Sequence, residues 1–216
     1  MRQLHYYPST AAMAPHILLE EIGQPFKLVL VDRLESAHKS ASYLQLNPNG
    51  LIPVLTEAGL VLYESAAICL HLADAHPEAK LVPALGTPAR AHFYKWLVWL
   101  TNTLQASLVI YFYPQRWMKE GNSAGASELK AQAEIKVGGL LDQLDAEFAR
   151  HGGPWFLGAE YSALDAYALM LCRWTRNFAS PPARARPHLA PWLQRVLARP
   201  AVLRAFHTEQ LAQPWV

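Results

Sequence analysis

The feature that most constrains the fold is a change of hydrophobic periodicity near residue 81. Before it, short apolar runs with strand spacing alternate with helical runs; after it, the strand signals stop. The pattern predicts strands over 4–7, 28–31, 52–56 and 60–63 and helices over 14–22 and 65–75, with a hairpin turn at 57–59. Downstream it predicts helices over 87–113, 127–150, 191–198 and 200–211, and another that begins at 162.

This order indicates an α+β chain with two domains. Strand-helix-strand followed by strand-strand-helix is the thioredoxin-like arrangement, in which a right-handed crossover makes the first two strands parallel. We therefore predict an N-terminal thioredoxin-like βαβ-ββα domain over 1–80, a linker over 81–86 and an all-helical domain over 87–216. The start of the second domain is marked by Thr87 as a helix cap and Pro88 at the first helical position.

Composition excludes several classes of protein. Hydrophobic residues make up 52% of the 216 residues, which indicates packed cores and not disorder. The most apolar run, 97–112, is interrupted by polar residues and is short for a bilayer, and the N-terminus lacks the apolar core of a signal peptide. We therefore expect a cytoplasmic protein without membrane association. The net charge is only +2, and although it is unevenly spread between the two halves, the asymmetry is too mild to indicate a nucleic-acid partner.

The segment 47–55 contains a proline that enters a strand, Pro53. Proline cannot donate a ladder hydrogen bond, and a cis X-Pro bond in a tight turn is the usual way to accommodate it. Such a bend would leave the N–H and C=O of Ile52 free to pair with an extended peptide. A trans Pro53 in an ordinary turn before an edge strand is an equal alternative on this segment alone.

A second informative segment places Glu64 and Ser65 where a strand ends and a helix begins at once. The first N–H groups of a helix have no internal partner and, with the helix dipole, form a site for a carboxylate. Ser65 adds a hydroxyl donor, and Glu64 supplies a negative charge for an ammonium group. Together they would bind the head of an α-amino acid, although Ser65 acting only as a helix cap is the alternative.

The strand that Pro53 enters, the hairpin that follows and the Glu64-Ser65 pair together resemble the glutathione site of the cytosolic glutathione transferases. The chain resembles a bacterial member of this family with mixed beta-like and delta/theta-like features. The resemblance implies glutathione as co-substrate. Its γ-glutamyl head would bind Glu64 and Ser65, and its cysteinyl backbone would pair with Ile52, before Pro53. It also places His38 near the glycyl end, where Lys39 would serve the same carboxylate.

The segment 156–165 resembles the buried capping box of the same family, in which Ser162 and Asp165 close the start of a core helix. We interpret this motif as part of the folding chemistry and expect no ligand there.

The thiol activator is expected in the loop between the first strand and the first helix. A hydroxyl there, aided by the helix N-terminus, would stabilise a thiolate. When the chain is aligned with the family without gaps, counting back from Gly23, Ser9 falls on the serine that delta- and theta-like members use. The segment 14–16 instead resembles the beta class and places Thr10 just before Ala11, where that class carries a cysteine. We rank Ser9 above Thr10 and keep Tyr6 as a third candidate.

The second substrate is expected beside the last turns of the first long helix. Tyr111, Tyr113 and Trp117 are candidates for an aromatic wall, which Trp174 and Phe178 would complete. Ordinary core packing is the alternative for each of them. A broad aromatic pocket suits a hydrophobic electrophile.

These observations predict a glutathione transferase that activates the thiolate for attack on small hydrophobic electrophiles. The family also implies a homodimer. Nine scattered histidines without ligand spacing predict no metal. The alternatives are a non-catalytic glutathione- or ligand-binding protein of the same fold, or a glutathione-dependent peroxidase, dehalogenase or isomerase. The isomerase is disfavoured because 8–11 matches its Ser-Ser-Cys run poorly.

Overall fold

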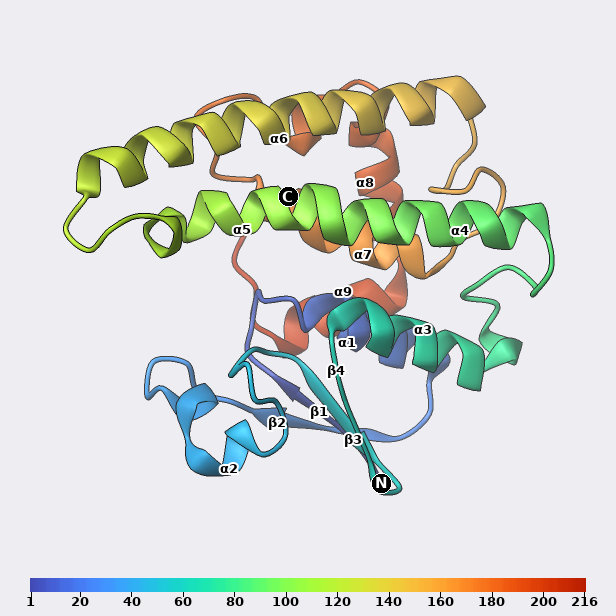
Figure 1. The fold of residues 1–216 in the computed structure, drawn as a ribbon. Helices are drawn as coiled ribbons and strands as arrows, with labels where there is room; N and C mark the ends of the chain where they lie inside the picture. Colours follow the sequence, from blue (N-terminus) through green and yellow to red (C-terminus); the bar gives the residue numbers. More distant parts are fainter.

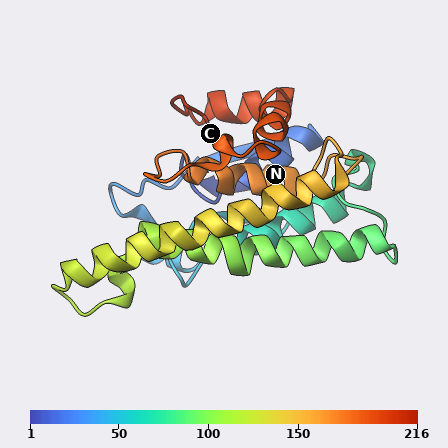
Figure 2. The same cartoon turned by 90° about the horizontal axis from the view of Figure 1, so that it is seen from above.

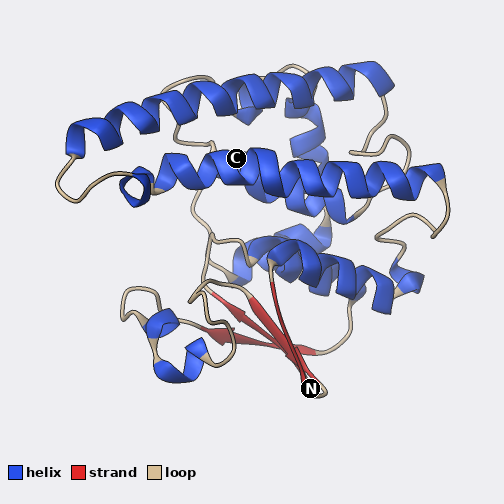
Figure 3. Ribbon diagram, viewed as in Figure 1, coloured by secondary structure: helices blue, strands red, loops and turns tan.

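A four-stranded mixed sheet forms the base of the N-terminal part in the computed structural model, which describes residues 1–216 (Figures 1 and 3). Its order is β2-β1-β3-β4. As expected, β1 and β2 are parallel, whereas β3 is antiparallel to both β1 and β4. The strands are β1 (Arg2–Tyr6), β2 (Phe26–Leu30), β3 (Val54–Glu57) and β4 (Leu60–Tyr63).

Two helices, α1 (Met13–Ile22) and α3 (Ser65–Ala75), cover one face of this sheet and separate it from the helical part (Figure 1). α1 ends at Gly23, whose φ of 71° is the left-handed conformation typical of a helix C-terminus. The short helix α2 (Ala41–Leu44) lies beyond β2, next to a single 3₁₀ turn over Ala37–Lys39. The thioredoxin-like arrangement predicted from the sequence is therefore confirmed.

The second part is entirely helical. α4 (Pro88–Trp99), a π-helical segment (Leu100–Gln105) and α5 (Ala106–Phe112) form one continuous rod, alongside which α6 (Ser123–His151) runs (Figures 1 and 2). The remaining helices are α7 (Ala163–Trp174), α8 (Leu189–Leu197), which packs against α6 and α7, and α9 (Pro200–Thr208), which packs against α1. α6 begins earlier than predicted, because the side chain of Asn122 accepts the N–H of Gly125 and caps the helix there.

The capping box predicted at the start of α7 is present. The carboxylate of Asp165 is buried and accepts the N–H groups of Phe156 (2.9 Å), Ser162 (2.9 Å) and the Trp192 indole (2.8 Å). Burial raises the pKa of Asp165 to about 6. One carboxylate therefore joins the loop before α7 to α8 through three hydrogen bonds.

The two parts share one hydrophobic core of 45 buried residues, with α1 and α3 packed against α7 and α1 also against α9. The connecting segment is fixed as well, because the C=O of buried Leu81 accepts the N–H of Ala163 at 2.7 Å. Both cysteines, Cys69 and Cys172, are buried and unpaired, and burial raises the pKa of both thiols, that of Cys172 to about 12. None of the helices combines the length and apolar character needed to cross a membrane.

Candidate functional site

The strand register brings three segments together at one end of the strands, which we call the edge of the sheet. Val54 of β3 lies opposite His5 of β1 on one side and Tyr63 of β4 on the other. Three segments are consequently neighbours: the loop after β1, the Ile52–Pro53 pair before β3 and the start of α3 after β4. The sheet topology therefore assembles the three segments singled out in the sequence.

The Ile52–Pro53 bond is cis, as predicted. The preceding carbonyl, that of Leu51, accepts hydrogen bonds from the Tyr43 hydroxyl at 2.8 Å and the Asn47 amide at 2.9 Å. These contacts hold the turn in place through Leu51. No hydrogen bond within the chain engages the N–H or C=O of Ile52. The backbone of Ile52 is therefore free to pair with an extended ligand.

Glu64 and Ser65 open α3 at the same edge. Glu64 has a φ of 72°, and the first helical residue, Ser65, is 6% exposed. Burial, then the charges of Cys69 and Glu64, raise the pKa of Tyr167 in α7. Neither Glu64 nor Ser65 lines the cavity described next; they lie beyond Ile52, around the helix N-terminus.

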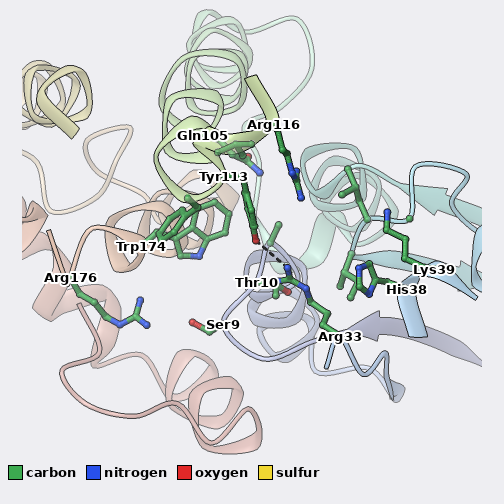
Figure 4. A pocket seen from close by; sticks show the side chains of 16 residues that line it. Ser9, Thr10, Arg33, His38, Lys39, Gln105, Tyr113, Arg116, Trp174 and Arg176 are labelled. Carbon is green, nitrogen blue, oxygen red and sulfur yellow. Dashed lines mark hydrogen bonds between the residues drawn. The ribbon is translucent and has the colours of Figure 1, made fainter. Parts of the chain in front are cut away.

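A cavity of about 330 Å³ lies between the sheet domain and the helical part (Figure 4). It contains seven of the residues expected from the sequence, from both halves of the chain: Ser9, Thr10, His38, Lys39, Ile52, Tyr113 and Trp174. Its remaining lining is Ala11, Arg33, Gly50, Leu51, Gln105, Val109, Phe112, Arg116 and Arg176. The volume is at the lower end of the range for small-molecule sites.

The two candidate hydroxyls differ in their hydrogen bonds. The Thr10 hydroxyl donates its proton to the C=O of Tyr7 at 2.6 Å, so it has none left for a sulfur. The Ser9 hydroxyl makes no hydrogen bond within the chain. Ser9 has a φ of 60°, and its N–H donates to the buried carboxylate of Glu209 at 2.9 Å. Tyr6 does not line the cavity.

The expected aromatic wall needs correction at three positions. Tyr111 and Phe178 are buried and pack on each other, with ring centroids 4.3 Å apart, and neither lines the cavity. Trp117 is 50% exposed and lies outside the lining. Successive residues of a helix point about 100° apart, so Phe112 faces the cavity where Tyr111 cannot.

Several lining residues were missed in the sequence. Val109, Phe112 and Arg116 are among them; their spacing of three and four residues from one another and from the predicted Tyr113 was the available signal. Gln105, one turn earlier, ends the π-helical segment and accepts a hydrogen bond from the Tyr167 hydroxyl through its Oε1. Its amide NH₂ remains as a donor for a ligand.

The lining is basic and contains no carboxylate. Arg33 donates to the Tyr113 hydroxyl at 3.1 Å, and the guanidinium of Arg116 lies 4.1 Å from the centre of the Tyr113 ring. A Cβ at Gly50, whose φ is 59°, would lie 2.9 Å from the backbone C=O of His38 and 2.8 Å from the Lys39 ammonium, so glycine permits the close approach to this segment. Burial, then the charges of Lys39 and Arg33, lower the pKa of His38, so the positive charge at this end comes from Lys39.

Both halves of the chain match family models. Residues 8–75 match the glutathione S-transferase N-terminal domain, and residues 100–200 match the glutathione S-transferase C-terminal domain. Glutathione S-transferase GstA of Escherichia coli O157:H7 is 28% identical over 97% of this chain and 99% of its own length. 

Solved structures agree with this likeness. A glutathione transferase homologue from Sulfitobacter with bound glutathione has a TM-score of 0.88 at 27% identity, covering 98% of this chain and 99% of its own. A sphingomonad glutathione S-transferase complexed with glutathione has a TM-score of 0.82 at 31% identity, covering 97% of this chain and 100% of its own.

Proposed function

Because this chain belongs to the glutathione S-transferase family, we propose that it uses Ser9 to activate the glutathione thiol for attack on small hydrophobic electrophiles. The observation that carries the proposal is a hydroxyl without a partner, that of Ser9, in the same cavity as the unpaired backbone groups of Ile52. Residues 1–80 then bind glutathione, residues 87–216 shape the second pocket, and 81–86 connect them.

Glutathione is proposed to lie along the edge formed by the three segments. Its γ-glutamyl carboxylate binds the α3 N-terminus and Ser65, and its ammonium binds Glu64. The cysteinyl unit pairs with Ile52, which directs the thiol toward the loop before α1. The glycyl carboxylate binds Lys39, with His38 as a neutral hydrogen-bonding neighbour. These contacts come from three different elements, so they fix the position of the sulfur before the second substrate arrives.

Ser9 is proposed to donate its hydroxyl proton in a hydrogen bond to the sulfur. A free cysteine thiol has a pKa of about 8.5, so a hydrogen bond that favours the thiolate increases the reactive fraction at neutral pH. The sulfur then forms a bond to the electrophilic carbon while the leaving group departs with its electron pair, and the thiol proton passes to solvent. Phe112, Tyr113 and Trp174 provide the apolar surface for the electrophile.

The test combines retention on immobilised glutathione with turnover of a chromogenic chlorodinitroarene. Ser9→Ala should lower kcat about 10- to 100-fold, or about 1.4–2.8 kcal/mol, with a smaller change in glutathione affinity. Thr10→Ala is the matched control, because its hydroxyl already donates to Tyr7. A larger loss with Thr10→Ala would contradict the assignment. Retention without turnover would favour the non-catalytic binding protein, and absence of both would refute the glutathione function.

The assembly is proposed to be a homodimer with two-fold symmetry, the commonest closed arrangement, acting in the cytoplasm. Exposed apolar side chains on α4 and β4 support a covered surface there: Tyr94 is 41% exposed, Val98 56% and Val61 44%. Sedimentation should give twice the chain mass of 24.1 kDa at micromolar concentration. A species of single-chain mass would refute the dimer.

A further inference from the structure

The cations that line the cavity have no acidic partners. Arg33, Lys39, Arg116 and Arg176 all line it, none forms an ion pair, and no Asp or Glu shares the lining. Elsewhere in the chain, six arginines pair with carboxylates at 2.5–3.1 Å: Arg2, Arg90, Arg150, Arg186, Arg199 and Arg204. The positive charge in the cavity is thus left for a ligand.

Glutathione does not use all of this charge. Its proposed carboxylate partners are the α3 N-terminus and Lys39. Figure 4 shows Arg176 beside Trp174 and Ser9, on the opposite side of the cavity from His38 and Lys39. At that place Arg176 cannot bind the glycyl carboxylate of glutathione, which lies beside His38 and Lys39. The Arg176 guanidinium is therefore free to bind the second substrate.

Arg176 is only partly engaged by the protein. Its Nη1 donates to the C=O of Arg173 at 3.1 Å, and no acceptor in the chain engages its Nε or Nη2. Burial lowers the pKa of Arg176, yet a guanidinium remains protonated in proteins. A partly buried positive charge with free donors is stabilised by an anion, and a guanidinium matches the two oxygens of a carboxylate.

The neighbouring wall is aromatic and offers donors. Phe112 and Trp174 meet edge to face, with ring centroids 6.2 Å apart. The indole Nε1 of Trp174 is buried without an acceptor, and Gln105 adds its amide NH₂ to the guanidinium donors of Arg176. This end of the cavity therefore combines a surface for an aromatic ring with donors for a negatively charged substituent.

We propose that the second substrate is an aryl electrophile that carries a carboxylate, with its ring against Phe112 and Trp174 and its carboxylate on Arg176. This inference rests on the proposed function, since it names the substrate class for the same site. In the reaction, the glutathione sulfur bonds to the ring carbon that bears a halogen. The carbon–halogen bond breaks, halide leaves with the electron pair, the thiol proton goes to solvent, and the carboxylate is unchanged.

The closing experiment compares two electrophiles that differ only in charge, a chlorodinitrobenzoate and the chlorodinitrobenzamide with the same ring substitution. For each we measure the ratio of enzymatic kcat/KM to the uncatalysed rate, which removes the intrinsic reactivity of the arene. The benzoate should be preferred at least about tenfold by the intact protein. Arg176→Met should abolish that preference, and Arg176→Lys should retain most of it. Arg195→Met is the control, since Arg195 is exposed and only donates to the C=O of Pro154.

Three outcomes would overturn the inference. Equal slowing of both electrophiles by Arg176→Met would mean that Arg176 acts on the common thiolate and not on the substrate charge. Absence of a benzoate preference in the intact protein would refute the substrate class directly. An equal loss of preference in Arg195→Met would show a general effect of surface charge and would count against Arg176 too.

Calorimetric titration with the two S-aryl glutathione conjugates separates this inference from the proposed function, because it needs no turnover. If neither electrophile reacts, the transferase function fails, but tighter binding of the carboxylate conjugate that disappears in Arg176→Met still supports the anion site. Equal affinity for both conjugates, or no binding of either, overturns it. Circular dichroism of both Arg176 variants checks folding, and Arg176→Lys keeps the test decisive if Arg176→Met does not fold.

Discussion

Replacing Glu209 should disable the loop that carries Ser9, although the two residues are 200 positions apart. Glu209 follows α9, and its side chain is fully buried. One carboxylate oxygen accepts the Ser9 N–H at 2.9 Å, and the other lies 2.9 Å from Nδ1 of His16 in α1, which is also fully buried. Ser9 has a φ of 60°, which costs a non-glycine residue roughly 1–2 kcal/mol, so the conformation depends on such an anchor.

The magnitude follows from the groups left without partners. Glu209→Ala removes the partner of the buried His16 ring and of the partly buried Ser9 N–H. Since each loss costs about 1–3 kcal/mol at full burial, the free energy of unfolding should fall by up to about 6 kcal/mol. Glu209→Gln keeps the volume and one acceptor for Ser9, and its NH₂ can donate to the other tautomer of His16. It should therefore cost only about 1 kcal/mol, the excess of a charge-assisted over a neutral hydrogen bond.

Activity should follow the same order. Once Ser9 is released from its left-handed conformation, its hydroxyl leaves the position beside the sulfur, and Glu209→Ala should lower kcat about tenfold or more. Urea titration and turnover of a chlorodinitroarene measure the two effects. Arg204→Ala is the control: it breaks the contact with Glu20, also between α1 and α9, but Arg204 is 53% exposed and contacts neither Ser9 nor His16. It should cost under about 1 kcal/mol and leave kcat unchanged. Stability and kcat near those of the intact protein in Glu209→Ala would refute the anchor.

Three further predictions concern binding and folding. Glu64→Ala and Ser65→Ala should each weaken glutathione binding by about 1.5–3 kcal/mol with less effect on kcat, because the γ-glutamyl head is remote from the sulfur; unchanged affinity in both would place the head elsewhere. Ser9→Gly should be more stable than Ser9→Ala by roughly 1 kcal/mol, since glycine adopts a φ of 60° freely; coincident denaturation curves would argue against strain at this residue. Asp165→Asn should lower the free energy of unfolding by about 3 kcal/mol. In one orientation its NH₂ would face the N–H of Ser162, and in the other it would face the N–H groups of Phe156 and Trp192. An unchanged melting temperature would contradict this.

The sequence by itself determined the features that depend on local chemistry. The strand Leu60–Tyr63 and the helix Ser65–Ala75 lie where apolar spacing and turn residues placed them. The capping box at Asp165 lies within one short segment that resembles the family motif, whereas the segment around Pro53 alone left cis and trans as equal alternatives. These elements are predictable because neighbours along the chain are also neighbours in space.

Only the tertiary structure decided which side chains meet in the cavity. Periodicity shows that the rod before Pro114 is helical, but its rotation about its own axis depends on what packs against it, and this put Phe112 in the wall in place of Tyr111. Arg176 and Glu209 carry no local signal, since each acquires its role from a residue on another element. Contacts between distant segments are set by the packing of a shared core. Burial of apolar surface is not directional, so the sequence alone does not specify which apolar faces will pack against each other.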